Sequence, residues 1–131
     1  MAKDRRGRFN DSVIKMTISA RKQRKRLYSM DSTASRKTMI VPVSPDLRRQ
    51  YGLRKIALRK GDTVTVVKGD KEIKGVEGKV SKVDIRTRRV TVDGITIPKA
   101  DGKQAARPVS FSNLMVTAMA QDAKRKTGKG A

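Results

Sequence analysis

The chain has 131 residues, which is enough for one small domain with extensions, and only 36% of them are apolar. Its formal net charge of +21 lies far outside the magnitude of about 2 to 8 that suits a small soluble domain, which indicates a polyanionic partner. Cysteine and histidine are absent, which excludes disulfides, thiolate nucleophiles, zinc bound by cysteine or histidine, and the most common general base. Nucleic acid and an anionic membrane surface remain as candidate partners.

The positive charge is spread along the whole chain. Residues 1–40 carry +9, residues 41–100 carry +8 and residues 101–131 carry +4. Because the middle of the chain is basic as well, we expect the folded domain itself to contact the polyanion. The apolar runs are too short to span a bilayer, and no apolar segment follows the basic N-terminus as in a signal peptide. We therefore expect a soluble, intracellular protein without a membrane partner.

The N-terminal segment over residues 1–12 is polar and has no periodic pattern, so we expect it to be disordered in isolation. A polar residue at its end can cap a helix. The apolar spacing over residues 13–18 fits a short helix and a strand equally well, and both stay open.

A strongly basic segment, R-K-Q-R-K-R-L-Y, occupies residues 21–28. Its composition favours a short helix over residues 19–29, without an apolar face wide enough to join a core. We interpret it as an arm that contacts phosphates and becomes ordered on RNA, with Leu27 and Tyr28 as an apolar anchor or stacking pair. A solvated basic tail or a localisation signal is the alternative interpretation.

A short extended segment and a well-delimited helix come next. Pro42 restricts the extended segment to a sheet edge or a loop. We expect Ser44, which a proline follows, to cap the helix and Gly52 to end it. Leu47 and Tyr51 are one turn apart, so we expect them to dock the helix on the domain while its basic residues point to solvent or RNA.

The densest apolar pattern runs from residue 59 to residue 97 and contains five of the ten glycines. Val64 and Val66 share one face of a first strand, and a lysine-rich loop over residues 68–75 follows. In the next strand Val80 points inward. Val83 is an odd number of positions away, so in a regular strand its side chain would point to the opposite face, a change of parity in the apolar pattern.

That change of parity predicts a bulge or bend near residues 81–82, a feature that curls a sheet into a barrel. Gly78, inside the same strand, suits a tight bend or a close approach of backbone. Asp-Gly at residues 93–94 predicts a hairpin that pairs residues 90–92 with residues 95–97.

We expect residues 99–108 to be irregular, with one Asp-Gly turn, and a last strand over residues 113–119. Five short strands separated by turns predict a mainly β fold, a small closed barrel accompanied by short helices.

Several kinds of site are excluded or disfavoured. The glycine-rich stretch lacks the G-K-[ST] ending of a phosphate-binding loop, and Asp62, Asp70 and Asp84 match no metal-ligand spacing. No nucleophile, base and metal come together in a recognisable constellation, so we expect neither an enzyme nor a cofactor. The scarcity of aromatic residues disfavours a single-strand binder built on base stacking, and folded RNA recognised by shape fits better.

The centre of the chain contains the strings R-K-G-D-T-V-T-V-V-K-G-D, K-G-V-E-G-K-V-S-K-V-D and R-V-T-V-D-G-I. Together they resemble a KOW motif of the ribosomal kind. The flanking strings R-K-Q-R-K-R-L-Y, S-P-D-L-R-R-Q-Y-G-L-R-K-I-A-L and S-F-S-N-L-M-V-T extend the likeness over residues 21–119. With them the chain resembles the archaeal and eukaryotic branch of the large-subunit ribosomal protein twenty-four family, called ribosomal protein twenty-six in eukaryotes. The loop over residues 69–75 is longer than the family's usual form, and the first eighteen residues look like an addition.

The resemblance implies an SH3-like barrel that binds large-subunit ribosomal RNA as a structural constituent of cytoplasmic ribosomes. It also implies an early role in subunit assembly and a position near the peptide exit tunnel. The implied partners are neighbouring large-subunit proteins and nascent-chain or targeting factors at the tunnel exit, and no homo-oligomer is expected. A KOW-domain transcription elongation factor is the alternative, although such a factor normally has a separate α/β domain for which 131 residues leave no room. A DNA-packing protein of the nucleoid type is a third possibility.

We expect a basic N-terminal arm over residues 1–43, the barrel over residues 44–119 with the KOW motif at about 59–97, and a basic tail over residues 120–131. The residues predicted to contact RNA are Arg21, Lys22, Arg24, Lys25, Arg26, Tyr28, Arg36, Lys37, Arg48, Arg49, Arg54, Lys55, Lys60, Lys68, Lys71, Lys74, Lys79, Lys82, Arg86, Arg88 and Arg89. The motif glycines are Gly61, Gly69, Gly75, Gly78 and Gly94.

Overall fold

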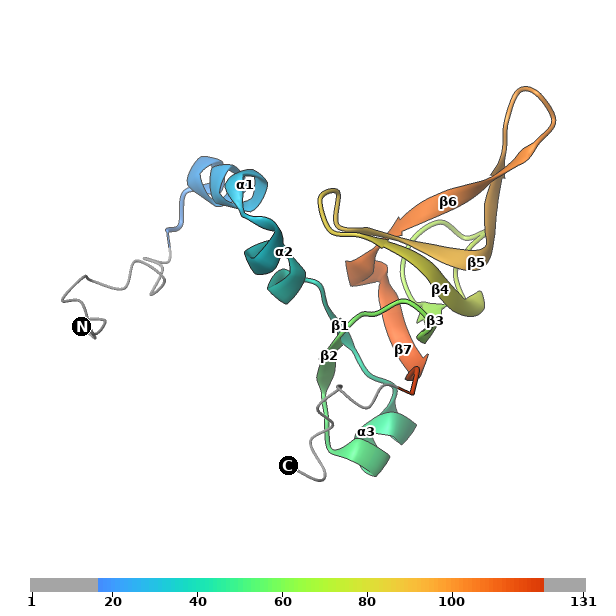
Figure 1. The fold of residues 1–131 in the computed structure, drawn as a ribbon, viewed down its shortest axis with the longest axis horizontal. Helices are drawn as coiled ribbons and strands as arrows, with labels where there is room; N and C mark the ends of the chain where they lie inside the picture. Colours follow the sequence, from blue (N-terminus) through green and yellow to red (C-terminus); the bar gives the residue numbers. More distant parts are fainter. Residues whose placement is uncertain (1–16, 122–131) are drawn as a thin grey trace. The chain divides into compact units, whose positions relative to one another are not determined.

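The computed structural model describes residues 17–121 and divides into two compact units (Figure 1). The first unit, Met1–Met30, contains one described helix, and the second, Asp31–Ala131, contains the remaining described elements. The expectations for the N-terminal segment, for an element at residues 13–16 and for most of the C-terminal tail lie outside the described residues.

The helix of the first unit, α1 (Ala20–Ser29), confirms the helix predicted for the basic arm. It buries none of its own residues, as its sequence without an apolar face indicated. Leu27 is 37% exposed and Tyr28 is 80% exposed. A ten-residue helix without a buried face is only marginally stable in water.

The second unit begins with α2 (Ser32–Thr38), whose N-terminus is capped by Asp31. The Asp31 carboxylate accepts a hydrogen bond of 3.1 Å from the Ala34 backbone N–H. A two-stranded antiparallel sheet of β1 (Ile40–Pro42) and β2 (Lys55–Ala57) follows, so the extended segment around Pro42 is an edge strand, as predicted.

Helix α3 (Pro45–Tyr51) joins these two strands and forms as its sequence predicted. The hydroxyl of Ser44 accepts a hydrogen bond of 3.4 Å from the Leu47 backbone N–H, and Gly52 ends the helix in the left-handed region at φ 69°. Leu47 is buried and Tyr51 packs partly buried against the core, so both dock the helix as expected.

The main sheet has five antiparallel strands in the order β6-β5-β4-β3-β7. The unit is therefore mainly β and consistent with a small SH3-like barrel, as predicted. A single turn of 3-10 helix, η1 (Phe111–Asn113), precedes the last strand, and Val43 forms a bridge to Val116 that links the segment after β1 to β7. The strands are β3 (Thr63–Val66), β4 (Glu77–Asp84), β5 (Arg89–Pro98), β6 (Gln104–Ser110) and β7 (Leu114–Ala118).

The core of the second unit is rich in valine, as the scarcity of aromatic residues required. It already includes Met39, Val41 and Val43, which lie before residue 44. The division of the chain at residues 43 and 44 stays a prediction, while the packed residues begin earlier. The buried hydrophobic residues are Met39, Val41, Val43, Leu47, Ile56, Leu58, Val64, Val66, Ile73, Val80, Val90, Val92, Ile95, Val109, Leu114 and Val116.

The predicted bulge in β4 is present. Val80 pairs with Val92 and Lys82 pairs with Thr91, so the register between β4 and β5 shifts at Ser81. The Ser81 hydroxyl donates a hydrogen bond of 3.1 Å to the Thr91 carbonyl oxygen, which closes the gap in the ladder. The extra residue explains why Val80 is buried although the following apolar positions have the opposite parity.

The hairpin predicted at Asp93 and Gly94 is wrong. β5 runs straight through this dipeptide, and its pairing with β6 shifts register between Thr91 and Thr96. Gly94 has a φ of 91°, so the Asp-Gly pair supplies an irregularity within a long strand instead of a turn. The local signal for a turn was real, but the strand continues because β6 is available as a partner for its second half.

The real turn lies between β5 and β6, at residues 99–103. The Lys99 N–H donates to the Lys103 carbonyl oxygen at 2.8 Å, and the Gly102 N–H donates to the Lys99 carbonyl oxygen at 2.9 Å. The Asp-Gly turn expected there is thus confirmed, whereas residues 104–108, predicted as irregular, belong to β6. The hairpin extends beyond the rest of the sheet (Figure 1).

Asp62 is a fully buried carboxylate that holds two backbone segments together. It accepts hydrogen bonds of 2.9 Å from the N–H of Arg59, before β3, and of 2.9 Å from the N–H of Ala120, after β7.

Asp62→Ala leaves both donors without this acceptor, so we expect a loss of about 3 kcal/mol in the free energy of unfolding. Urea denaturation measures this, with Asp101→Ala in the exposed β5–β6 turn as the control, and equal stability of the two variants would refute the role.

Candidate nucleic-acid interface

The residues predicted to contact RNA lie on the surface. Twenty of the twenty-one are exposed, and Arg88 alone is half-buried. Exposure is ordinary for lysine and arginine, so their arrangement on the fold carries more information. Four of them lie close together in the sequence: Arg48 and Arg49 belong to α3, Arg54 follows α3, and Lys55 is the first residue of β2.

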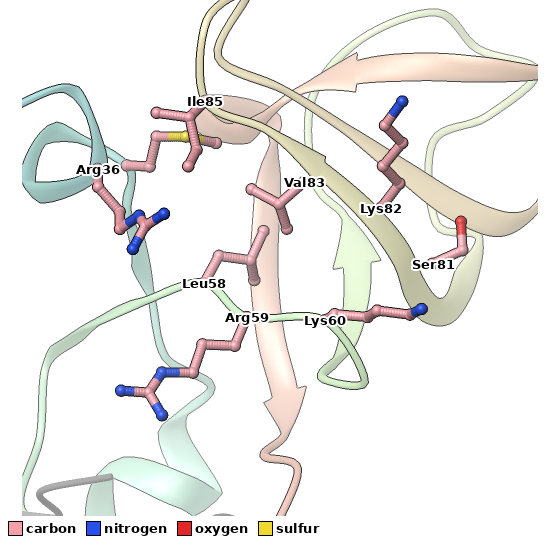
Figure 2. Close-up of a pocket in the computed structure, with 9 residues that line it drawn as sticks. Arg36, Leu58, Arg59, Lys60, Ser81, Lys82, Val83 and Ile85 are labelled. Atoms are coloured by element: carbon pink, nitrogen blue, oxygen red, sulfur yellow. The ribbon is translucent and has the colours of Figure 1, made fainter. Parts of the chain in front are cut away.

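A groove of about 560 Å³ brings together cations that are far apart in the sequence (Figure 2). Arg36 comes from α2, Lys60 from the connection between β2 and β3, and Lys82 from β4. In Figure 2, Leu58 and Val83 lie in the middle of the groove, with Arg36 on one side and the two lysines on the other. The complete lining is Arg36, Met39, Leu58, Arg59, Lys60, Ser81, Lys82, Val83 and Ile85.

The floor of this groove is apolar and its rim is cationic. Met39 and Leu58 are buried, and Val83 and Ile85 are half-buried. No acidic side chain lines it. The arrangement favours a ligand that combines an anionic group with an uncharged, less polar body.

The fold explains how the groove forms. The Leu58 N–H donates a hydrogen bond of 3.4 Å to the Met39 carbonyl oxygen, which joins the segment after β2 to the residue before β1. The bulge at Ser81 then sets the orientation of the next two residues, Lys82 and Val83, in the groove lining. The sequence predicted the bulge, but it gave no sign that the bulge faces residues 36 to 39.

A second cationic group lies at the turn between β4 and β5, where Arg86, Arg88 and Arg89 were predicted to contact RNA. Asp84 organises this turn, because its Oδ1 atom accepts hydrogen bonds from the N–H of Arg86 at 3.0 Å and of Thr87 at 3.3 Å. Arg88 adopts a positive φ of 54°, which is uncommon for a residue with a side chain.

The Thr87 side chain, its N–H and other donors of the turn hold the pKa of the Asp84 carboxyl below its ordinary value. The stabilisation of the turn is therefore present above the unfolded pKa of about 3.9 and is lost as the pH falls through the folded pKa. We expect Thr87→Ala to raise the pKa of Asp84 toward the ordinary value, measured by NMR titration of the carboxyl carbon. Thr96→Ala in β5 is the control, and an unchanged Asp84 pKa in Thr87→Ala would contradict the assignment.

The loop over residues 68–75 displays Lys68, Lys71 and Lys74, and it is anchored at several points. The buried side chain of Ile73 packs in the core, and the Gly75 N–H donates to the Val66 carbonyl oxygen at 2.8 Å. An ion pair joins Asp70 in the loop to Arg107 on β6. The sequence pattern did not indicate this pair, because its members are 37 residues apart.

The conformation and packing of the backbone require glycine at the motif positions. A β-carbon on Gly78 would collide with the Asp93 carbonyl oxygen of the neighbouring strand, which confirms the predicted close approach of backbone. The remaining motif glycines all have a positive φ: Gly61, Gly69, Gly75 and Gly94.

Among residues 17–121, no three acidic side chains are grouped so that they could hold a metal ion. Asp62, Asp70 and Asp84 instead have separate structural partners. Over the same residues, no helix has the length and apolar character that crossing a membrane requires.

Comparison with known proteins gives consistent matches over most of the chain. Residues 17–128 match the family described as eukaryotic ribosomal proteins L26 and archaeal ribosomal proteins L24. The chain is 41% identical over 106 residues to large ribosomal subunit protein uL24 of Sulfurisphaera tokodaii, covering 80% of this chain and 77% of that protein. It is 40% identical over 111 residues to uL24 of Methanosphaera stadtmanae, covering 85% and 93%. The uL24 protein of Saccharolobus solfataricus is 38% identical over 102 residues, covering 78% and 84%.

Proposed function

Since the chain belongs to the family of eukaryotic L26 and archaeal L24 ribosomal proteins, we propose that it binds large-subunit ribosomal RNA through its exposed cations. The resemblance seen in the sequence is thereby confirmed, and the chain is a structural component of the large ribosomal subunit, not an enzyme. As part of the ribosome it acts in the cytoplasm.

The distribution of cations over the fold is the observation that supports RNA binding. Exposed arginine and lysine side chains lie on α1, on α3, along the groove, on the loop over residues 68–75 and at the β4–β5 turn. Such side chains neutralise phosphates and release the counterions that surround RNA, which supplies affinity without reading sequence. Cations distributed over several elements fit a folded RNA better than one extended strand.

Each segment has a part in this proposal. Within the predicted arm over residues 1–43, α1 becomes ordered on RNA, since it buries none of its own residues and its helical form depends on a partner. Met39, Val41 and Val43 already pack in the core of the second unit. The domain over residues 44–119 contributes the anchored loop and the β4–β5 turn. The basic tail over residues 120–131 adds further phosphate contacts.

Family membership also supports the finer parts of the proposal. The chain joins the large subunit early in assembly, lies near the peptide exit tunnel, and contacts neighbouring ribosomal proteins there. Nascent-chain or targeting factors are its further partners, and it acts as a single copy. Reconstitution of subunits with this chain added last tests the order of assembly, because early binding predicts fewer complete particles than when it is added first.

Sedimentation of ribosomes on a sucrose gradient tests the placement in the cell. We expect one copy of the chain per large subunit, retained after a wash at moderate salt, because many simultaneous phosphate contacts must be broken together. An elongation factor would instead travel with RNA polymerase. Recovery of the chain only in free or polymerase-bound fractions would therefore contradict the proposal.

A further inference from the structure

The groove between α2, the β2–β3 connection and β4 differs from the other cationic parts of the surface. The lysines of the loop over residues 68–75 are exposed, as are Arg86 and Arg89 at the β4–β5 turn, which suffices to contact phosphates. The groove adds a concavity of about 560 Å³ with an apolar floor. That volume falls in the range of about 300–1,000 Å³ that sites for small organic ligands occupy.

Phosphate groups alone do not account for such a floor. A phosphate placed over Leu58 and Val83 would lose water without gaining hydrogen bonds, which is unfavourable. A nucleotide extruded from a folded RNA combines the two required parts, because its phosphates are anionic and its base and sugar present apolar faces. The groove is complementary to an anionic ligand, because Arg36, Lys60 and Lys82 line it and no carboxylate does.

We infer that this groove holds one unstacked nucleotide of the ribosomal RNA. Its base lies against Leu58 and Val83, and its phosphates lie at Arg36, Lys60 and Lys82. The inference rests on the proposed binding of ribosomal RNA and specifies what one part of that surface recognises.

The side chains of the lining also predict how strongly the groove discriminates between different bases. No aromatic side chain is present in it, so the base packs on aliphatic groups. Ser81 is the one uncharged polar side chain of the lining, and its hydroxyl hydrogen is directed to the Thr91 carbonyl oxygen. The groove therefore recognises that a nucleotide is extruded and reads its base identity only weakly.

Val83→Lys tests this inference, because it fills the groove and at the same time adds a positive charge. If the groove only attracts phosphates, the variant binds large-subunit ribosomal RNA as tightly as the wild type or more tightly. If a nucleotide enters the groove, affinity falls by about fivefold to tenfold at physiological salt despite the added charge. The matched control is Val67→Lys, which makes the same change at an exposed valine outside the groove lining and should bind at least as well as the wild type.

Ultraviolet cross-linking of the wild-type chain to the RNA, followed by mass spectrometry, gives an independent readout. We expect a single nucleotide cross-linked to a peptide that contains residues 58–60 or 81–85, and loss of that cross-link in Val83→Lys. Should Val83→Lys prove unstable, the exposed double substitution Arg36→Gln and Lys60→Gln replaces it and should weaken the same cross-link.

The outcomes separate this inference from the general function. Equal RNA affinity of Val83→Lys and Val67→Lys overturns the nucleotide site while RNA binding stands. Protection of the groove by an acidic peptide of a neighbouring protein, without a nucleotide cross-link, also overturns it. Absence of any binding of the wild-type chain to the RNA refutes the proposed function itself.

Discussion

Gly78→Ala is expected to lower the free energy of unfolding by about 3 kcal/mol or more, a large part of the stability of a small domain. A β-carbon at this position would collide with the backbone carbonyl oxygen of Asp93 and would lie 2.9 Å from a methyl carbon of Val92. Neither of these two residues can move away easily to make room for the β-carbon. Asp93 belongs to the adjacent strand, and Val92 is a core residue that is 1% exposed.

Urea denaturation followed by circular dichroism measures this effect. Gly102→Ala, in the β5–β6 turn, is the matched control, because its φ is positive at 79° and a β-carbon there meets nothing within 4 Å. That variant carries only the conformational penalty of a left-handed residue, about 1–2 kcal/mol. If the two variants lose the same stability, the close approach of β4 and β5 is not what requires glycine at position 78.

Neutralising α1 is expected to have the largest effect on RNA binding. Glutamine at all five of its cationic positions should reduce the slope of log affinity against log salt by up to about 4, because each phosphate contact contributes roughly 0.7 to 0.9. Affinity at physiological salt should fall by at least about tenfold. The five positions are Arg21, Lys22, Arg24, Lys25 and Arg26.

This change leaves the fold of the second unit intact, so binding and stability can be read separately. α1 buries no residue, and glutamine is itself a good helix former. The melting temperature of the variant should match that of the wild type. Lys99→Gln with Lys103→Gln, near the β5–β6 turn, is the control and should keep the wild-type slope. A wild-type slope in the α1 variant would show that the helix is a solvated tail, the alternative interpretation of the arm.

Features decided by neighbouring residues could be predicted from the sequence. The boundaries of α3 follow from Ser44 and Gly52, which act within one turn of the backbone they cap. The bulge near Ser81 follows from the parity of apolar residues within a single strand. The exposure of nearly all predicted cations follows from the high cost of burying charge.

Features decided by distant partners could not be predicted in the same way. Asp93 and Gly94 carry a strong local signal for a hairpin, and only the presence of β6 beside the second half of β5 makes them an irregularity within a strand. The groove is lined by Arg36 and Lys82, which are 46 positions apart in the sequence, and the residues around each give no local signal of the other. Arg59 also lines the groove, although only its neighbour Lys60 is among the residues predicted to contact RNA.

Footprinting of large-subunit ribosomal RNA by the purified full chain is the most direct test of RNA binding. The experiment uses physiological salt, about 0.15 M, and an excess of duplex DNA as competitor. We predict discrete protected sites in folded regions of the RNA that persist against the DNA and disappear as salt is raised. Uniform, weak protection that duplex DNA abolishes at equal concentration would contradict the binding of ribosomal RNA and would favour a DNA-packing role.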